Sequence, residues 1–177
     1  MPELPVLHTE RLVLRPFEIS DGSRVKELAG DRKISDTTSA VPYPYEQGMA
    51  EAWIALHGNE FSSGKGMTLA VTLRNGPLIG AIGLEAKSQN YHAEIGYWIG
   101  VPYWNAGYCT EALRAVIDYI FSALSYRKIT ARHLVANPAS GRVMEKAGMK
   151  REGELINVLF KNGEFQTVAI YSVSSQG

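Results

Sequence analysis

The sequence predicts an α+β domain with about seven strands and about four helices, and three observations carry that prediction. Residues 94–112 read as a strand, a loop of small residues and the start of a helix. Several short segments alternate apolar and polar residues with the period of a strand, and two pairs of them are separated by Asn-Gly turns. Other segments repeat apolar residues at helical spacing.

Length and composition set the class of protein. The chain has 177 residues, which fits one domain spanning residues 1–177. Lysine plus arginine and aspartate plus glutamate both number 18, so no basic surplus points to nucleic acid. One cysteine excludes an intramolecular disulfide and a cysteine-based zinc site. No apolar run resembles a signal peptide or a membrane span, so we expect a soluble cytoplasmic protein.

The N-terminal half is predicted to contain one strand and two helices. Residues 9–17 alternate as a strand, with Leu12 and Leu14 on one face. A helix is expected over residues 18–28, capped by Ser20 or Asp21. Residues 31–45 lack periodicity and are expected to form a long loop, a type of segment that often carries function. A second helix is expected over residues 47–57, followed by a glycine-containing link over residues 58–66.

The remaining strands and helices follow from turn signals and periodicity. Strands are expected over residues 67–73 and 78–85, joined by an Asn-Gly turn, and over residues 91–100. A helix begins at Tyr108. A strand over residues 128–136 then leads into a helix over residues 137–146, which Gly148 terminates. The last two strands, residues 150–160 and 166–173, flank a second Asn-Gly turn.

The loop before Tyr108 has the features of a phosphate-binding site. A helix N-terminus presents unpaired N–H groups, and small residues let an anion approach the main chain. Three kinds of site compete as explanations: a P-loop, a dinucleotide-binding loop, or the pyrophosphate loop of an acyl-CoA enzyme. The first requires Gly-Lys-Ser/Thr and the second a three-glycine fingerprint, and neither spacing is present. The third fits best.

Two motifs carry a resemblance to a known family. The first reads GYW, then PYW, then GYCTEA, and comprises Gly96, Tyr97, Trp98, Pro102, Tyr103, Trp104, Gly107, Tyr108, Cys109, Thr110, Glu111 and Ala112. The second comprises Asn137, Ser140, Val143, Glu145, Lys146 and Gly148. With these motifs and its opening TERLVLR, the chain resembles the GCN5-related N-acetyltransferases (GNAT superfamily), and within them the branch of the ribosomal-protein alanine N-acetyltransferases. The resemblance covers residues 9–173. It departs from the usual loop at Trp104, Asn105, Ala106 and Cys109.

The resemblance implies a fold and a cosubstrate. The sheet would be mixed but largely antiparallel, and splayed between the fourth and fifth expected strands, where acetyl-CoA would lie without any metal. The pyrophosphate would meet the main chain of Asn105, Ala106, Gly107, Tyr108, Cys109 and Thr110. The amide-rich arm would pair with the main chain of Ile99, Gly100 and Val101, and with the side chain of Asn137. A plain helix cap is the alternative role for Asn137. Ser140 would point toward the thioester or the pantetheine end.

The family's reaction is direct attack of an amine on the thioester, which requires a neutral amine. Glu94 is the candidate general base. The alternative is that Glu94 is a surface or salt-bridged carboxylate. His92 and Trp98 share its face of the strand and are candidate substrate contacts, and His92 could assist as base. In the expected loop, Tyr43 and Tyr45 are candidate substrate contacts, or their rings cover the core.

The departing thiolate raises a second question. Many superfamily members place a tyrosine seven residues after the helix asparagine, where this chain has Met144, which cannot donate a proton. Ser140 is the substitute donor, unless the thiolate leaves without a protein acid. Cys109 offers a different mechanism, because a helix N-terminus lowers a thiol pKa and could make it a nucleophile.

The acceptor class is the least constrained inference. The resemblance favours a protein N-terminal α-amine, with a small-molecule amine (an antibiotic, polyamine or amino acid) as the alternative. A non-catalytic CoA-binding domain is a further possibility, whereas the absence of a P-loop lysine disfavours phosphoryl transfer. We expect a monomer or homodimer without nucleic-acid or membrane partners.

Overall fold

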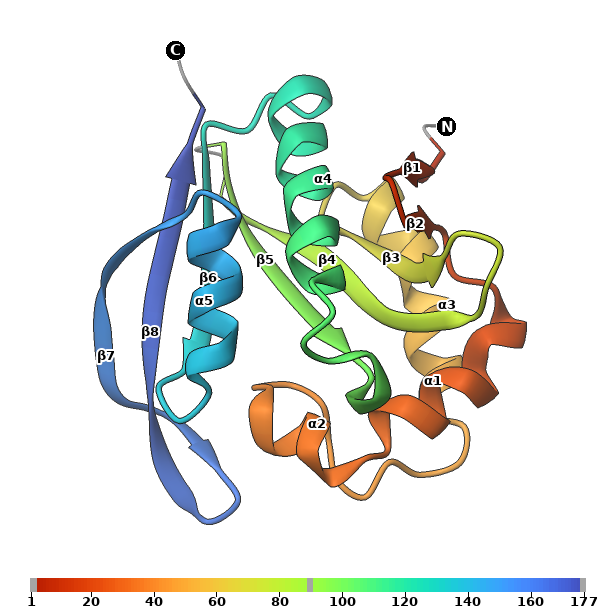
Figure 1. Cartoon of the computed structure of the whole chain (residues 1–177), viewed down its shortest axis with the longest axis horizontal. Helices are drawn as coiled ribbons and strands as arrows, with labels where there is room; N and C mark the ends of the chain where they lie inside the picture. The colour runs from red at the N-terminus through yellow and green to blue at the C-terminus, as the bar shows by residue number, and fades with distance from the viewer. Residues whose placement is uncertain (1–2, 89–90, 176–177) are drawn as a thin grey trace.

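The computed structural model describes residues 3–88 and 91–175 and contains one sheet of eight strands (Figure 1). The strand order is β1-β2-β3-β4-β5-β6-β8-β7. Among the described strands, β5 and β6 form the one parallel pair, so the prediction of a mixed, largely antiparallel sheet is confirmed. The strands are β1 (Leu7–His8), β2 (Leu12–Arg15), β3 (Gly66–Leu73), β4 (Leu78–Ser88), β5 (His92–Ile99), β6 (Lys128–Leu134), β7 (Lys150–Lys161) and β8 (Glu164–Ser174).

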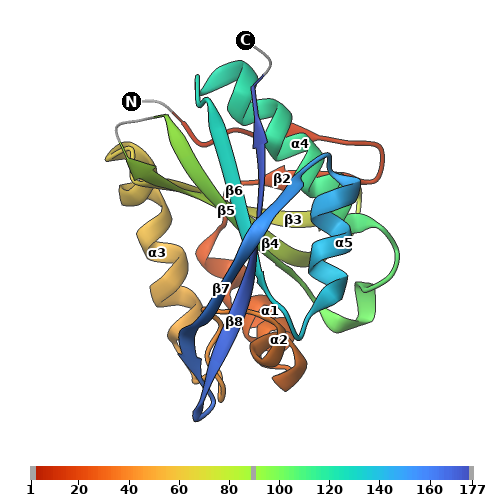
Figure 2. The ribbon, with the colours of Figure 1, turned by 90° about the vertical axis from the view of Figure 1, so that its left-hand side faces the viewer.

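Helices cover both faces of the sheet, as Figure 2 shows. One core packs beneath α4 and α5, and its largest buried side chains include Leu113 and Ile120 of α4. A second core lies on the other face beneath α1 and α3 and includes Val25, Ile54 and Trp98. The α-helices are α1 (Gly22–Ala29), α2 (Arg32–Thr37), α3 (Met49–Ser62), α4 (Tyr108–Ala123) and α5 (Pro138–Lys146).

The predicted first strand, residues 9–17, is divided in the structure. The chain turns at Thr9, whose N–H donates to the Leu12 carbonyl, and β1 runs back antiparallel to β2. The predicted helix over residues 18–28 begins as the 3-10 turn η1 (Ile19–Asp21) and continues as α1. Neither predicted cap residue caps a helix with its side chain. Ser20 lies within η1, and Asp21, at the N-cap of α1, accepts from the Glu18 N–H and from Arg15 instead of from α1.

Two further boundaries differ from the prediction. The expected loop over residues 31–45 contains the short helix α2, whose start is capped by the Asp31 side chain accepting from the Lys33 N–H. A helix of six residues is too short to show periodicity. The prediction that a link begins at residue 58 was wrong, because α3 continues through Gly58 to Ser62. An exposed helical glycine costs only about 1 kcal/mol, so Gly58 does not end the helix.

The expected splay lies between β5 and β6. These strands pair from His92 with Lys128 to Ile95 with Ala131, and beyond that point they separate (Figure 1). On its other side β5 remains paired with β4 as far as Ile99. The Gly100 N–H bonds the Ile79 carbonyl, so antiparallel alternation directs the main-chain groups of Tyr97 and Ile99 away from β4. These groups point into the gap.

A buried histidine on α3 makes stability depend on pH. His57 is 3% exposed, with its ring packed edge-on at 4.5 Å from the Trp53 ring and at 5.3 Å from Phe17. Neither ring nitrogen has a hydrogen-bond partner within the described part of the chain. Burial lowers the His57 pKa to about 4, below its value of about 6.5 in an unfolded chain. The fold therefore favours the neutral ring, and protonation opposes folding.

We expect the free energy of unfolding to fall by about 3 kcal/mol from this residue alone as the pH drops from about 6.5 to 4. The contribution is fully present above pH 6.5. His57→Phe keeps an aromatic ring in the cluster and removes the titration, so its stability should be less dependent on pH over this interval. Urea unfolding at several pH values measures the difference. Replacement of the exposed His8 by Gln is the control, and equal pH dependence in wild type and His57→Phe would contradict the prediction.

Candidate active site

A groove of about 1130 Å³ runs along the sheet where β5 and β6 separate. Its lining includes Glu94, Tyr97 and Trp98 of β5 and Ser140 of α5. Trp98 packs in the core beneath α1 and α3, whereas Tyr97 packs against the core beneath α4 and α5. The groove therefore reaches side chains from both faces of the sheet through the gap. Glu94 and Ser140, the predicted base and donor, lie along the same groove.

The loop before α4 has the geometry of an anion site. Asn105 and Gly107 have positive φ angles of 60° and 81°. Gly107 is the N-cap of α4, and no side chain caps the helix. The first N–H groups of α4, those of Tyr108, Cys109 and Thr110, lack acceptors within the helix. They form an N-terminus suited to a phosphate.

The side chains of Arg11 and Glu111, which the sequence analysis did not place in the site, hold this loop in position. Arg11, in the turn between β1 and β2, donates to the Ala106 carbonyl at 2.9 Å and to the Glu111 carboxylate at 2.7 Å. Its guanidinium also stacks 4.5 Å from the centre of the Tyr108 ring. Burial acts to raise the pKa of Glu111, but hydrogen bonds from Thr9 and Arg11 outweigh it and lower that pKa. The opening TERL motif thus supports the anion loop.

The main chain after β5 is largely committed to internal hydrogen bonds. The Ile99 carbonyl accepts from the Trp104 indole N–H at 2.6 Å. The Gly100 carbonyl accepts from the Tyr103 N–H at 2.9 Å, and the Val101 carbonyl from the Trp104 N–H at 3.2 Å, within η2 (Val101–Tyr103). An extended ligand in the gap would meet the main chain of Tyr97 and the Ile99 N–H. Tyr97 was not among the predicted main-chain contacts.

Asn137 stands at the N-terminus of α5 but makes no side-chain capping hydrogen bond. Its amide N–H donates instead to the Thr37 carbonyl at 3.1 Å, at the end of α2. Lys161, near the turn of the β7–β8 hairpin, donates to the carbonyls of Ser35 and Thr38. The amide oxygen of Asn137 is not used in this contact, which leaves an acceptor for an N–H of the cosubstrate arm. The structure therefore does not support the plain-cap alternative.

Glu94 lines the groove and belongs to an ion pair. The Arg132 Nε atom lies 2.9 Å from its Oε1 atom, and Lys87 Nζ lies 3.8 Å from its Oε2 atom. Lys87 is closer to Glu85, at 2.8 Å. Both alternatives for Glu94 are thus compatible with this geometry: the carboxylate is salt-bridged, and it also faces the groove. Its Oε2 atom is the less constrained oxygen.

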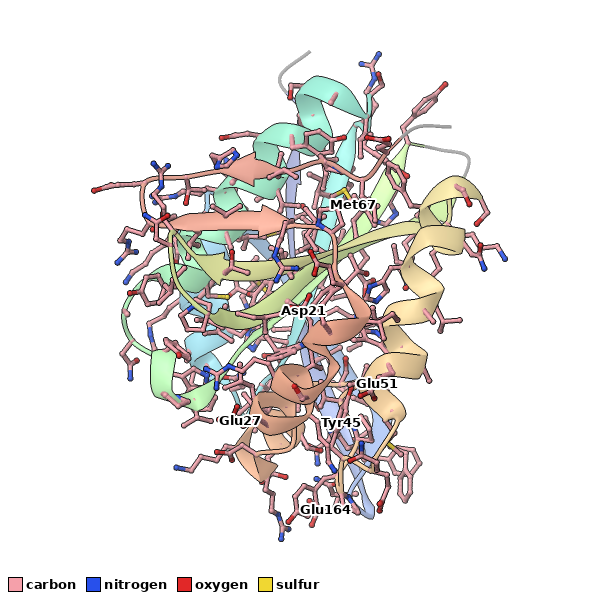
Figure 3. All side chains as sticks on the ribbon, turned by 90° about the vertical axis from the view of Figure 1, so that its right-hand side faces the viewer. Asp21, Glu27, Tyr45, Glu51, Met67 and Glu164 are labelled. Carbon is pink, nitrogen blue, oxygen red and sulfur yellow. The ribbon has the colours of Figure 1, made fainter. Side chains whose placement is uncertain are left out.

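The four predicted substrate contacts do not all reach the groove. Tyr45 and Trp98 line it, and Figure 3 shows Tyr45 toward the same end of the molecule as Glu164 of the β7–β8 hairpin. Tyr43 is 53% exposed and stacks against Arg32. The His92 ring hydrogen-bonds the Thr130 hydroxyl at 2.8 Å and is not part of the lining.

Three residues bear on protonation of the thiolate and on the alternative nucleophile: Tyr97, Met144 and Cys109. The Tyr97 hydroxyl lies 2.9 Å from the Ser140 hydroxyl, in the region for which the sequence offered Ser140 alone. Met144 is buried in the core. Burial raises the pKa of the Cys109 thiol to about 12, which argues against the alternative mechanism in which Cys109 is the nucleophile.

A family model described as Acetyltransferase (GNAT) domain matches residues 11–150, which is most of the chain. The chain belongs to the GNAT acetyltransferase family. It is therefore an acyltransferase that uses acetyl-CoA, as the anion loop and the splayed strands already suggested. Among the described residues no group of three or more His, Cys, Asp or Glu side chains could hold a metal ion. No helix in the described chain is long and apolar enough to cross a membrane.

Individual proteins agree with this assignment. The chain is 29% identical to YoaA, an uncharacterized N-acetyltransferase of Bacillus subtilis, over 96% of each chain. It is 26% identical to the spermidine N(1)-acetyltransferase of Vibrio cholerae, over 89% of this chain and 90% of that one. RimL, a ribosomal L7/L12 alpha-N-protein acetyltransferase solved with coenzyme A, superimposes with a TM-score of 0.88 at 18% identity, covering 96% and 98% of the chains. That likeness is one of fold.

Proposed function

We propose that this GNAT enzyme acetylates a protein N-terminal α-amine. The observation that carries the proposal is the length of the groove, whose volume is about 1130 Å³. It extends from the gap between β5 and β6 past Tyr45 to Leu159 of β7, which is room for several residues of a peptide. RimL, which has the same fold, acts on such an acceptor.

The charges along the groove also favour this acceptor over a polyamine. A polycation requires carboxylates that are not already paired. Glu94 is paired with Arg132, and Glu85 is paired with Lys87. The groove lining as a whole holds three carboxylates, Glu60, Glu85 and Glu94, beside the cations Lys65 and Arg132. The groove therefore offers little net negative charge to a polyamine.

In the proposed mechanism the protein supplies a base and a hydrogen-bond donor. When bound, acetyl-CoA supplies a thioester whose carbonyl the amine attacks. The amide C–N bond forms as the C–S bond breaks, and the sulfur keeps the electron pair of the broken bond. Glu94 takes the surplus proton of the amine nitrogen through water, and the Ser140 hydroxyl donates a hydrogen bond to the sulfur. Residues 105–110 and Asn137 hold the cosubstrate.

The chemistry of the acceptor adds a further reason. At pH 7, deprotonating an α-amine with a pKa of about 7.8 costs roughly 1 kcal/mol, whereas a lysine-like amine with a pKa of about 10.4 costs roughly 4.6 kcal/mol. An ion-paired carboxylate acting through water meets the smaller demand. A lysine side chain requires a stronger base than the groove presents.

A small-molecule amine is the second candidate, favoured by the likeness to spermidine N(1)-acetyltransferase. The test is a set of acceptors at pH 7: a peptide with a free N-terminus and no lysine, an N-terminally blocked peptide with lysine, and spermidine. We expect acetylation of the first, located by mass spectrometry at its α-amine. Preference for spermidine would support the second candidate. Binding of CoA without turnover of any amine would support a non-catalytic domain.

The setting of the enzyme is part of the proposal. We place it in the cytoplasm, where acetyl-CoA and newly made protein N-termini meet. Residues 1–177 would act as one catalytic domain, as a monomer or homodimer. Gel filtration with light scattering distinguishes these two states.

A further inference from the structure

The Tyr97 side chain makes a contact that the proposed mechanism does not yet use. Tyr97 projects from β5 at the point where β5 and β6 have separated, and its hydroxyl reaches the first turn of α5. There it lies 2.9 Å from the Ser140 hydroxyl and 3.3 Å from the Ser140 carbonyl. Both side chains line the groove. Two hydroxyl groups therefore meet at the gap, where the thioester is expected.

The Tyr97 and Ser140 hydroxyls can be hydrogen-bonded in two ways, and the two differ in whether Ser140 can still donate to a ligand. Each hydroxyl has one hydrogen to donate. If the phenol donates to the Ser140 carbonyl, the Ser140 hydroxyl can donate back to the phenol and has no hydrogen left for a ligand. If the phenol donates to the Ser140 Oγ atom, the Ser140 hydrogen is directed elsewhere. The 2.9 Å contact joins the two hydroxyls in either arrangement, but the 3.3 Å from the phenol to the Ser140 carbonyl is longer than is usual for an O–H donor. The geometry therefore favours the second arrangement, in which the phenol donates to Oγ.

We propose that Tyr97 is a positioning residue whose phenol donates to Ser140 Oγ and thereby commits the Ser140 O–H to the sulfur of CoA. This role rests on the proposed function of Ser140. Linked hydrogen bonds polarise one another, so the Ser140 O–H becomes a better donor to a negative sulfur. A hydroxyl pair thus takes the place of a direct phenol donor at the position occupied by Met144, which is buried and has no hydrogen to give.

The surroundings of the phenol keep it protonated. Burial raises the pKa of Tyr97 well above the usual value for tyrosine, with smaller contributions from Cys109 of α4 and Tyr171 of β8, and together they outweigh the hydrogen bond with Ser140, which acts to lower it. The pKa of Cys109 is itself raised by burial. The pKa of Tyr171 is also raised, by burial and then by its hydrogen bond to Glu145. The phenol therefore remains a donor throughout the range in which a thiol titrates.

The test is to measure the pKa of the CoA thiol in the binary complex of the protein with CoA. The ultraviolet absorbance of the thiolate reports the titration. This measurement requires neither an acceptor amine nor turnover. A donor to the thiolate stabilises the charged form, so losing it raises the thiol pKa. We expect Tyr97→Phe and Ser140→Ala each to raise it by about one pH unit. The double variant should show no more than the Ser140→Ala shift, because Tyr97 acts through Ser140.

Tyr171→Phe is the matched control. Tyr171 is a buried tyrosine beside α5 whose hydroxyl bonds Glu145 at 3.2 Å rather than Ser140, so its loss should leave the thiol pKa unchanged. Thermal unfolding with CoA confirms that each variant is folded and loaded. An unshifted thiol pKa in Tyr97→Phe would overturn the proposal, as would additive shifts in the double variant, which would make Tyr97 an independent donor.

The acceptor assays and this titration can fail separately. If no amine is acetylated but the thiol pKa shifts as expected, the N-terminal acceptor is wrong and the role of Tyr97 stands. If a peptide is acetylated and Tyr97→Phe leaves the thiol pKa unchanged, the acceptor stands and the role of Tyr97 is rejected.

Discussion

Replacing Gly107 by valine is expected to weaken acetyl-CoA binding by at least about 100-fold while the protein stays folded. Gly107 has a φ of 81°, a conformation that costs a β-branched residue of order 1–3 kcal/mol. Relief of that strain rotates the peptide groups of the loop and turns their N–H groups away from the anion. Hydrogen bonds to a charged group contribute about 1.5–3 kcal/mol each, so losing one or two of them accounts for the expected change.

The valine side chain also changes what surrounds the loop. A Cβ atom at Gly107 would lie 3.4 Å from the Arg11 guanidinium, so the two branches of valine disturb the residue that holds the Ala106 carbonyl. Binding is measured by isothermal titration with acetyl-CoA, and folding by thermal unfolding without ligand. We expect Gly107→Val to disturb both the N–H groups of the loop and the Arg11 contact that supports them.

Gly64→Val provides the matched control for Gly107→Val. Gly64 also has a positive φ, 68°, and a Cβ atom there would meet nothing within 4 Å. It follows α3 on the opposite face of the sheet from α4, so a valine there introduces comparable strain away from the loop. Its affinity for acetyl-CoA should match that of wild type. If a folded Gly107→Val bound acetyl-CoA normally, the pyrophosphate would not lie on residues 105–110.

Local patterns predicted the sheet and its helices well, and tertiary contacts account for most of what they missed. The stripe on α4 was visible in the sequence because Leu113, Val116 and Ile120 repeat at helical spacing, and all three are buried. Helix α2 was missed because its stability comes from contacts outside its own six residues. Its end is held by Asn137 and Lys161, which lie 100 or more residues away in sequence.

The site shows the same division. Gly107 and the start of α4 were identified from the loop motif, since the geometry of an anion site is local. Glu111 was recognised in the motif that opens α4, but its contact with Arg11 was missed because it joins segments 100 residues apart. Tyr97 was recognised as part of the GYW motif, but its partner Ser140 could be assigned only when the separation of β5 and β6 was known. Side-chain pairs across a splayed sheet have no signature in sequence spacing.

The second large effect is expected on turnover. Glu94→Gln should lower kcat with a peptide acceptor by about 100-fold, the lower part of the range for loss of a general base. Glutamine keeps the shape of the side chain and can still accept a hydrogen bond from Arg132, but it cannot take a proton. Acetyl-CoA affinity should be unchanged, since Glu94 lies on β5 away from residues 105–110. Steady-state kinetics and isothermal titration measure the two quantities.

Glu85→Gln separates catalysis from the general loss of a carboxylate in the groove. Glu85 lies directly opposite Glu94 in the β4–β5 register, lines the same groove and pairs with the same Lys87. Its replacement removes the same charge from a neighbouring position, and kcat should stay within about fivefold of wild type because exposed ion pairs contribute at most about 1 kcal/mol. Equal losses in both variants would mean that the groove needs negative charge rather than a base at Glu94. Unchanged kcat in Glu94→Gln across the pH range would leave Glu94 as a structural ion-pair partner of Arg132, with the proton passing to solvent unaided.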